Sequence, residues 1–260
     1  MRFFQACRRV LSLGVRFLHI SYLEARAEHQ STRIGVLWIP LQTLIFTAML
    51  ALVFRHAETY TPAQFFLYVL SGYVMWQFIQ STVNNSVDII QKKLEFAIHN
   101  NLDLAGIFIK LLIDRLFEFL INLAVLVVAV LILGPPSGWQ GVVLFPVLLA
   151  TMMLTSLAVS YLVNIVTIYV PDFASLIRTA TRFVFFASPI FWAAGEQTDV
   201  RRFLAQYNPV AHYLSVMRQV FGVEPVSPLS WMVCLALSAL LVLVAALVFR
   251  GTQSFVRNLK

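Results

Sequence analysis

Six apolar stretches, each about 20 residues long, constrain this chain more than any other feature of its sequence. A helix rises about 1.5 Å per residue, so about 20 apolar residues cross the roughly 30 Å hydrocarbon core of a bilayer. The stretches lack the alternating polarity of barrel strands, and a helix satisfies its own backbone hydrogen bonds in lipid. The sequence therefore predicts an all-α membrane protein with six transmembrane helices, at residues 34–54, 64–83, 111–134, 141–166, 176–194 and 229–249.

Basic residues predict the orientation of these spans. Fifteen of the 19 Lys and Arg residues fall on the side that the two termini share, and the other four are Arg55, Arg201, Arg202 and Arg218. Cytoplasmic loops carry the excess of Lys and Arg, so both termini are expected in the cytoplasm. The predicted regions are an N-terminal amphipathic cytoplasmic or interface segment (1–33), a transmembrane domain (34–250) and a cytoplasmic tail (251–260). The first segment is predicted to form an amphipathic helix that lies in the membrane interface, the alternative being a basic tail that only sets the orientation.

The composition excludes several classes of protein. Of the 260 residues, 60% are hydrophobic and 12% are charged, whereas soluble domains carry about 25% charged residues. An ordinary soluble enzyme, a nucleic-acid-binding domain and a disordered chain all need more charge, so no nucleic-acid partner is expected. The sequence has no phosphate-binding loop, HExxH motif, CxxC pair or GxSxG elbow. We therefore expect no catalytic residue, metal or cofactor in this chain.

The loop between the second and third predicted spans has the pattern of a short amphipathic helix. The apolar residues Val87, Ile90, Leu94 and Ile98 recur at helical spacing. Lys92 and Lys93 occupy the opposite face. Asn85 or Ser86 is the predicted N-cap. Lipid headgroups or a groove on a soluble partner would cover such a stripe, and the periodicity does not choose between them.

The segment between the fifth and sixth predicted spans is too polar to cross a membrane and too regular to be coil. Asn208 followed by Pro209 is a strong helix start, and Gly222 is a plausible stop. This pattern predicts two short helices around Asn208. They would dip into the outer leaflet, cap a cavity, or lie on the surface with only a packing role.

Three arginines near the predicted spans are candidates for binding a charged head group. They are Arg115, which has Glu118 three residues later, and Arg178 and Arg182, which are one helical turn apart. Burying charge in a membrane is costly, and such side chains usually extend to the lipid headgroups. The alternative is a cationic mouth that binds the phosphate oxygens of an anionic substrate.

Aromatic residues concentrate in the second and fifth predicted spans. Rings near span ends usually form an interfacial belt. Rings lining a path would instead suit sugars, which stack on aromatic faces. The candidates for such a path are Tyr73, Trp76, Phe183, Phe186, Phe191 and Trp192.

Three motifs resemble those of the membrane subunit of type-2 ABC exporters. The run Arg33–Leu41 resembles the family's LGxLW…P opening, Pro171-Asp172 followed by Ser188-Pro189-Ile190-Phe191 resembles its fifth-span region, and Asn208-Pro209-Val210 with Arg218 resembles its external NP…R element. The resemblance covers nearly the whole chain and is greatest to the subgroup that exports lipid-linked polysaccharides, such as O-antigen, capsule or teichoic-acid precursors. Val170 departs from the pattern, because family members often have Arg there, and this puts a salt-bridge role for Asp172 in doubt.

The resemblance implies partners and roles that the residues alone do not give. It implies a homodimer in the bacterial inner membrane, bound to two copies of a separate ABC ATPase that holds ATP and Mg. The helix at Val87–Ile98, with Lys93, would be the coupling helix on that ATPase. Tyr207, Asn208, Pro209 and Arg218 would belong to an outer gate, and the cargo would be an undecaprenyl-pyrophosphate-type lipid-linked glycan.

Two other classes of transporter are alternatives to a polysaccharide exporter. A type-2 ABC permease for drugs or lipids would have the same architecture and a different cargo. An ion-coupled secondary transporter would need midplane charges, broken helices or an internal repeat, and the sequence shows few unpaired midplane charges and no clear repeat.

Overall fold

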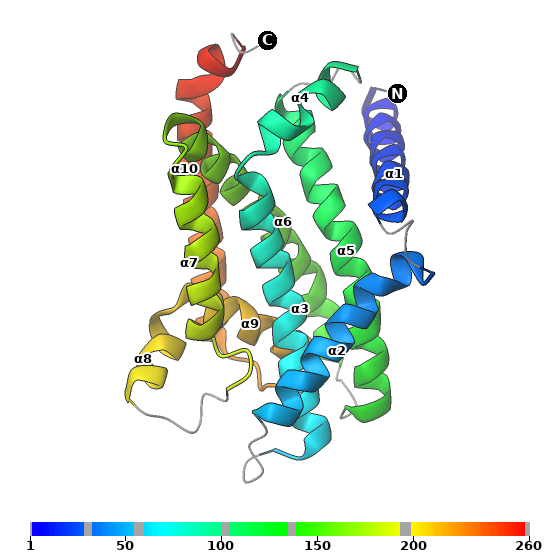
Figure 1. Ribbon diagram of the computed structural model, residues 1–260, viewed down its shortest axis with the longest axis vertical. Helices are drawn as coiled ribbons and strands as arrows, with labels where there is room; N and C mark the ends of the chain where they lie inside the picture. Colours follow the sequence, from blue (N-terminus) through cyan, green and yellow to red (C-terminus); the bar gives the residue numbers. More distant parts are fainter. Residues whose placement is uncertain are drawn as a thin grey trace.

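The computed structural model describes residues 2–28, 33–54, 60–99, 104–134, 139–192 and 199–257. These residues form a bundle of helices with no strand among them, as the sequence predicts (Figure 1). The elements are α1 (Arg2–Glu28), the 3₁₀ turn η1 (Gly35–Leu37), α2 (Trp38–Val53), α3 (Pro62–Ser86), α4 (Ile89–His99), α5 (Leu104–Leu133), α6 (Trp139–Tyr169), α7 (Phe173–Ala187), α8 (Asp199–Tyr207), α9 (Pro209–Val220) and α10 (Pro228–Arg257).

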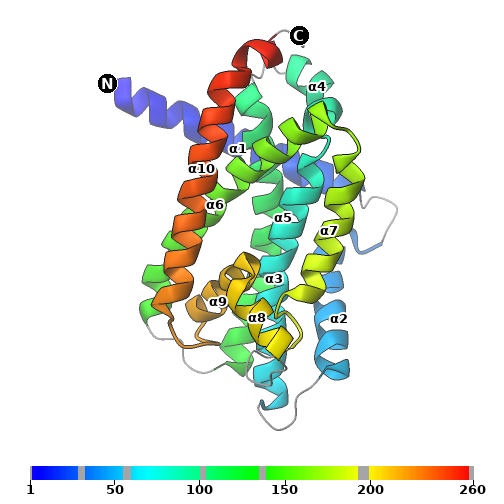
Figure 2. The same cartoon turned by 90° about the vertical axis from the view of Figure 1, so that its left-hand side faces the viewer.

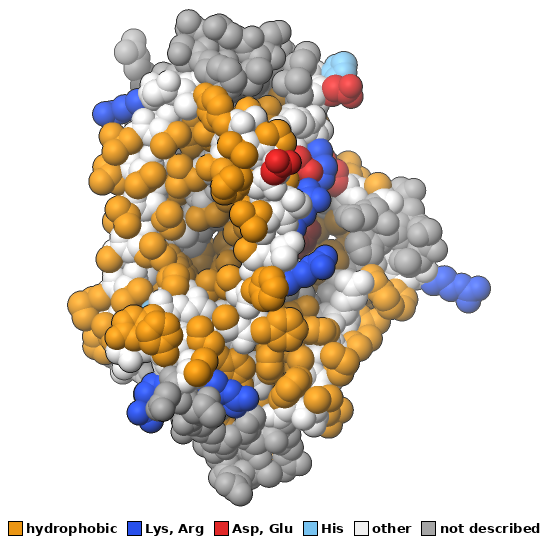
Figure 3. Space-filling view, turned by 60° about the vertical axis from the view of Figure 1, so that its left-hand side comes forward, with side chains coloured by type: hydrophobic (Ala, Val, Ile, Leu, Met, Phe, Trp, Pro, Cys, Tyr) orange, Lys and Arg blue, Asp and Glu red, His pale blue; other side chains and the backbone are white. Residues whose placement is uncertain are grey.

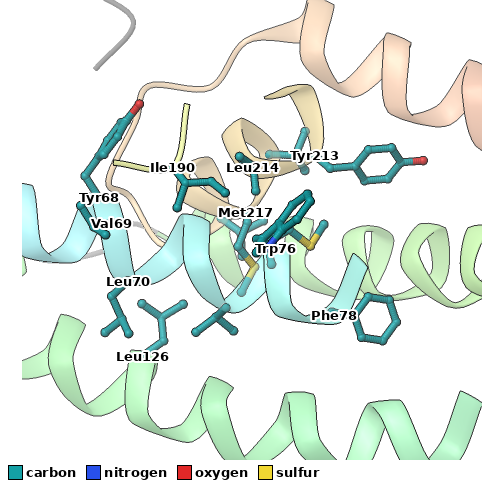
Figure 4. Packing of buried hydrophobic residues seen from close by; sticks show 14 of the residues in the cluster. Tyr68, Val69, Leu70, Trp76, Phe78, Leu126, Ile190, Tyr213, Leu214 and Met217 are labelled. Atoms are coloured by element: carbon teal, nitrogen blue, oxygen red, sulfur yellow. The ribbon is translucent and has the colours of Figure 1, made fainter. Parts of the chain in front are cut away.

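Helix α3 is the central element of the bundle. It packs against α2, α5, α6, α7 and α9, and Figures 1 and 2 show it between these helices. Its apolar side chains form the core together with residues of α5 and α9, and Figure 4 shows Trp76 beside Met217 and Leu70 beside Leu126. Because α3 is enclosed by protein, it can carry polar residues that a lipid-facing helix would expose to hydrocarbon.

The two ends of the bundle differ in what they hold. Helix α4 and both ends of the chain lie at one end, and α8 lies toward the other (Figures 1 and 2). We call these the α4 end and the α8 end. The predicted alternation of spans likewise places the termini and the loop helix on one side.

Among the described residues, four helices are long and apolar enough to cross a membrane: Gly35–Val53, Ala105–Leu133, Gln140–Tyr169 and Pro228–Thr252. They correspond to four of the six predicted spans. The other two predicted spans are α3, which carries several Gln and Asn residues, and α7, which has 15 residues and two arginines. The chain is thus a multi-pass membrane protein, and six crossings stay a prediction.

Two helices end or begin at other residues than the predicted spans and loop helix. The fifth span was expected to reach 194, but α7 ends at Ala187 because Ser188-Pro189 leaves the helix. Residues 193 and 194 lie outside the described residues. The loop helix was expected to begin at Asn85 or Ser86, but α3 stays helical through Ser86 and α4 begins at Ile89.

Both short helices before the last span form as predicted, as α8 and α9 on either side of Asn208. The Asn208 side chain accepts a hydrogen bond from the Val210 N–H at 3.0 Å, and Pro209 occupies the first helical position. Helix α9 is buried along most of its length. It therefore inserts into the bundle and does not lie on its surface.

Candidate functional site

A polar cavity of about 550 Å³ lies beside α3, between α2 and α5. Its lining is unusual for a membrane-embedded bundle because it is rich in carboxamide side chains. These are Gln42, Gln77, Gln80, Asn84, Asn85 and Asn122. Polar groups at such a position are costly unless they bond to one another or to the contents of a water-filled cavity.

Part of this polarity is satisfied within the protein by a closed ring of three hydrogen bonds. The Thr43 hydroxyl donates to Asn122 Oδ1 at 3.0 Å, Asn122 Nδ2 donates to Gln77 Oε1 at 3.3 Å, and Gln77 Nε2 donates to Thr43 Oγ1 at 3.1 Å. The ring joins α2, α3 and α5 and fixes the wall of the cavity. It leaves lining residues such as Gln80 and Asn85 to face the cavity contents.

The described residues that line the cavity include one ion pair and carry no net formal charge. Arg115, a head-group candidate, lines the cavity and donates to Glu118 at 3.0 and 3.2 Å. Because Glu118 lines the same cavity, its carboxylate offsets the attraction of Arg115 for a phosphate. This chemistry favours a neutral, hydroxyl-rich ligand over an anionic one.

A second cavity of about 280 Å³ lies between α2, α3 and α7 and is mainly aromatic. It shares Tyr73 and Gln80 with the first cavity, so α3 borders both. The remaining lining residues are Phe46, Trp76, Thr181, Arg182, Phe185 and Phe186. Ring centroids are 4.8 Å apart for Phe46 and Tyr73 and 5.6 Å apart for Trp76 and Phe185. Figure 3 shows a hollow on this side of the molecule with Lys and Arg side chains beside it.

The structure brings together some of the predicted aromatic candidates and separates others. Tyr73, Trp76 and Phe186 line the aromatic cavity, while Phe183 points away and is 70% exposed. Phe191 and Trp192 are buried at the α8 end. The ring centroids of Phe191 and Phe54 are 4.6 Å apart, and the Trp192 indole N–H donates to the Phe186 carbonyl at 3.3 Å.

The other two head-group candidates have different surroundings. Arg182 lines the aromatic cavity. Arg178, one turn away, donates to Asp88 at 3.0 Å at the start of α4. Of the three arginines, Arg182 is therefore the one placed to meet an anion in a cavity whose described lining contains no carboxylate.

The predicted coupling helix is α4, but much of its apolar stripe is covered by this chain. Val87 and Ile90 are 2% and 7% exposed, and Ile90 belongs to a cluster with Ile107, Phe108 and Ile165 of α5 and α6. The side chains of Leu94 and Ile98 lie outside the described residues. The outward face of α4 is polar, formed by Gln91, Lys92, Glu95 and His99. Among the described side chains of α4, the polar ones are therefore those exposed to a partner at this end.

Lys93 of α4 takes part in a polar cluster that joins three helices. Its ammonium lies 2.8 Å from Glu24 Oε1 of α1, and Lys110 of α5 lies 3.0 Å from Glu24 Oε2. Lys110, which is 1% exposed, also pairs with Asp114, and Asp114 accepts a hydrogen bond from Ser21 at 2.6 Å. Burial acts to raise the pKa of Glu24, but hydrogen bonds from Lys93 and Lys110 outweigh it, so the pKa is lowered from 4.5.

One of the outer-gate candidates, Arg218, is a buried arginine with several partners. Arg218, which is 1% exposed, donates to the Tyr68 carbonyl at 3.2 Å, the Pro189 carbonyl at 2.5 Å and Glu224 at 3.2 Å. Its guanidinium lies 3.5 Å from the centre of the Tyr68 ring. It thereby joins α9 to α3 and to the segment after α7.

The remaining gate candidates join the same region. Asn208 donates to the Ala187 carbonyl at 3.2 Å and to Ser188 at 2.9 Å, while Tyr207 is 64% exposed. Pro209 begins α9. Asn208 and Arg218 thus both hold the segment that follows α7, and Tyr207 faces outward.

Sequence reasoning missed the carboxamides, although the sequence carries a signal for them. Gln77, Gln80, Ser81 and Asn84 recur at helical spacing within a span that is otherwise apolar. That pattern indicates a polar stripe on one face of α3. Within the part of the chain that the structure describes, no group of three His, Cys, Asp or Glu side chains is arranged to hold a metal ion.

Comparison with known proteins identifies the family. The profile of the ABC-2 type transporter family matches residues 25–221. The chain belongs to this family. Relatives include the O-antigen export system permease protein RfbA of Myxococcus xanthus, 21% identical over 76% of each chain, and the protein of the same name from Klebsiella pneumoniae, 20% identical over 78% of each chain.

Membership in this family makes the chain a membrane permease of a type-2 ABC transporter. The family resemblance predicted from the sequence motifs is confirmed. Such permeases are transport components that work with an ABC ATPase, so the family implies an ATPase partner for this ABC-2 permease.

Proposed function

We propose that this chain is the permease subunit of an ABC exporter that moves a lipid-linked polysaccharide, O-antigen or capsule, across the bacterial inner membrane. Its permease relatives are named for O-antigen export. The single observation that carries the proposal is the pair of adjoining cavities, one lined by carboxamides and one by aromatic rings. A sugar chain offers hydroxyl groups to the former and apolar ring faces to the latter.

The proposed assembly is a homodimer with two copies of a separate ATPase, which holds ATP and Mg. In the proposed orientation the α4 end and both termini face the cytoplasm, and α4 contacts the ATPase through its outward polar face. Helices α8 and α9 would close the outer end of the path. The head of an undecaprenyl-pyrophosphate-type carrier would meet Arg182, the arginine that lines the aromatic cavity.

The passage of the glycan would use weak contacts that are repeatedly exchanged. A carboxamide both donates and accepts hydrogen bonds, so Gln80 and Asn85 can bond to hydroxyls of either orientation. Tyr73 and Phe186 supply rings on which sugar faces slide. Neither cavity offers a fixed strong site that would trap the chain.

The test is export by the complex purified with its ATPase and reconstituted in vesicles with lipid-linked glycan. Gln80→Leu removes the carboxamide shared by both cavities, and we expect export to fall roughly tenfold, as when a hydrogen bond of about 1.5 kcal/mol is lost. Gln140→Leu is the matched control, because Gln140 is exposed on α6 and lines neither cavity. Transport of drugs or phospholipids with no movement of glycan would contradict the proposal.

A further inference from the structure

The joint between α3 and α4 is held from two sides by helices distant in the sequence. The joint consists of Val87 and Asp88, which separate the two helices. On one side, the Val87 carbonyl accepts hydrogen bonds from Thr167 at 2.6 Å and from Asn164 at 3.3 Å, both on α6. Asn164 is fully buried. Helix α6 therefore fixes the backbone at the point where α4 begins.

On the other side, the joint is connected to α7. Arg178 Nη2 lies 3.0 Å from Asp88 Oδ2. Lys92 Nζ lies 3.0 Å from the same oxygen, but Lys92 belongs to α4 itself. In both views the start of α4 lies near the first half of α7 (Figures 1 and 2). Arg178 is thus the cation through which Asp88 reaches a different helix.

Helix α7 packs against the bundle on one side, so a displacement of α4 can move it. Among the helices it packs mainly against α3 and α6, the ring centroid of its Phe185 lies 6.3 Å from that of Phe46 on α2, and its other side is exposed from Phe173 to Phe186. One turn after Arg178 it carries Arg182, followed by Phe185 and Phe186, all of which line the aromatic cavity. A shift of α7 along or across α3 would therefore change the shape of that cavity.

We propose that the Asp88–Arg178 ion pair transmits displacement of α4 to α7, so that the wall of the aromatic cavity moves when α4 moves. The proposal rests on the proposed function, because the partner ATPase is what would displace α4. Exposed ion pairs contribute little to stability, and Arg178 is 51% exposed in its side chain. Breaking this pair should therefore disconnect α7 from α4 without unfolding the protein.

The experiment uses the reconstituted complex in a cysteine-free background, with spin labels at the exposed Phe183 of α7 and Leu240 of α10. In the parent complex we expect ATP to change the distance between the labels. In Arg178→Gln and Asp88→Asn we expect assembly and ATP hydrolysis to persist, the distance change to disappear, and export to fall by up to about fivefold, the most that an exposed ion pair supplies. Arg250→Gln is the matched control, because it removes an exposed arginine of α10 that belongs neither to the joint nor to α7.

A charge exchange separates transmission from a general loss of structure. The double variant Asp88→Arg with Arg178→Asp reverses the pair, and we expect it to recover the ATP-dependent distance change and most of the export that either single reversal loses. Normal export and a normal distance change in Arg178→Gln would overturn the inference. If ATP changed the distance between the labels in the parent complex but no glycan was exported, the proposed function would be refuted. The effect of the Asp88–Arg178 pair on that distance could still be measured.

Discussion

Arg218 shows how one buried side chain can hold a region of a membrane protein in place. Its guanidinium binds two backbone carbonyls and one carboxylate and stacks on Tyr68. An isolated buried charge is costly, whereas one with several partners is tolerated. The arrangement also requires a neighbour without a side chain, because a Cβ at Gly72 would lie 2.6 Å from Arg218 Nη2.

The first prediction concerns that close approach. Gly72→Ala should lower the free energy of unfolding by about 1–3 kcal/mol, the usual cost of overpacking a core. The expected observation is a lower Tm in detergent. Gly251→Ala is the control, because no atom lies within 4 Å of a Cβ at that helical position. Equal Tm values for the two variants would show that Arg218 moves aside without cost.

A second prediction at the residue scale concerns the buried pair of Lys110 and Asp114. Lys110→Met leaves the Asp114 carboxylate buried without its cation, which should destabilise the protein by about 3–5 kcal/mol. Adding Asp114→Leu removes that carboxylate and should restore much of the loss. Thermal unfolding of the single and double variants measures both effects. A double variant less stable than Lys110→Met would show that the polar cluster as a whole, including Ser21, is required.

The sequence motifs pointed to Arg218 but not to its partners, and the reason is physical. Two of the three groups it binds are backbone carbonyls, of Tyr68 and Pro189, and every residue has one. No residue type marks such a position. The carboxamides on α3 are different, because Gln77, Gln80 and Asn84 are visible as a polar stripe once helical spacing is applied to the second span.

At the scale of elements, the periodicity identified the helices but not what covers them. Apolar length located α2, α5, α6 and α10, because each must match the thickness of the bilayer. The stripe of α4 was expected to be covered by lipid headgroups or by a groove on a soluble partner, yet α5 and α6 of the same chain bury Ile90. Helical spacing predicts that an apolar face must be covered, but it does not predict which element covers it.

The third prediction concerns the docking of α1 through Glu24. The lowered pKa of Glu24 means that its ionised form is favoured in the folded protein. The resulting stabilisation is therefore complete above 4.5, the pKa of Glu24 in the unfolded chain. It is lost as the pH falls through the lower pKa that Glu24 has in the folded protein. We expect the protection factors of the α1 amides against hydrogen exchange to stay constant from neutral pH down to about 5 and to fall as the pH drops below 4.5.

A variant separates this effect from acid unfolding of the whole bundle. Glu24→Gln removes the charge at every pH, so α1 should exchange faster at neutral pH while α3 stays protected. Glu95→Gln is the control, because Glu95 is exposed on the outward face of α4. If α1 in Glu24→Gln exchanged as slowly as in the parent at pH 7, Lys93 and Lys110 would not hold α1 through this carboxylate.

At the scale of the whole molecule, the central question is how many times the chain crosses the membrane. Helix α3 has 25 residues and is long enough to cross, at about 1.5 Å per residue. Its polar residues face cavities and other helices, so a hydropathy criterion made for lipid-facing helices undervalues it. Helix α7 is short, but the chain continues toward the α8 end through Ser188 to Trp192.

Accessibility of single cysteines in sealed cells distinguishes the two topologies. If α3 and α7 cross, Gln91→Cys and His99→Cys of α4 should react from the cytoplasm, and Gln206→Cys of α8 should react from the opposite side. If α3 does not cross, α4 lies on the outer side and its cysteines react with a membrane-impermeant reagent from outside. The six-crossing arrangement predicts protection of both α4 cysteines until the membrane is permeabilised. Labelling of Gln91→Cys in intact cells would overturn it and would remove α4 from contact with any cytoplasmic ATPase.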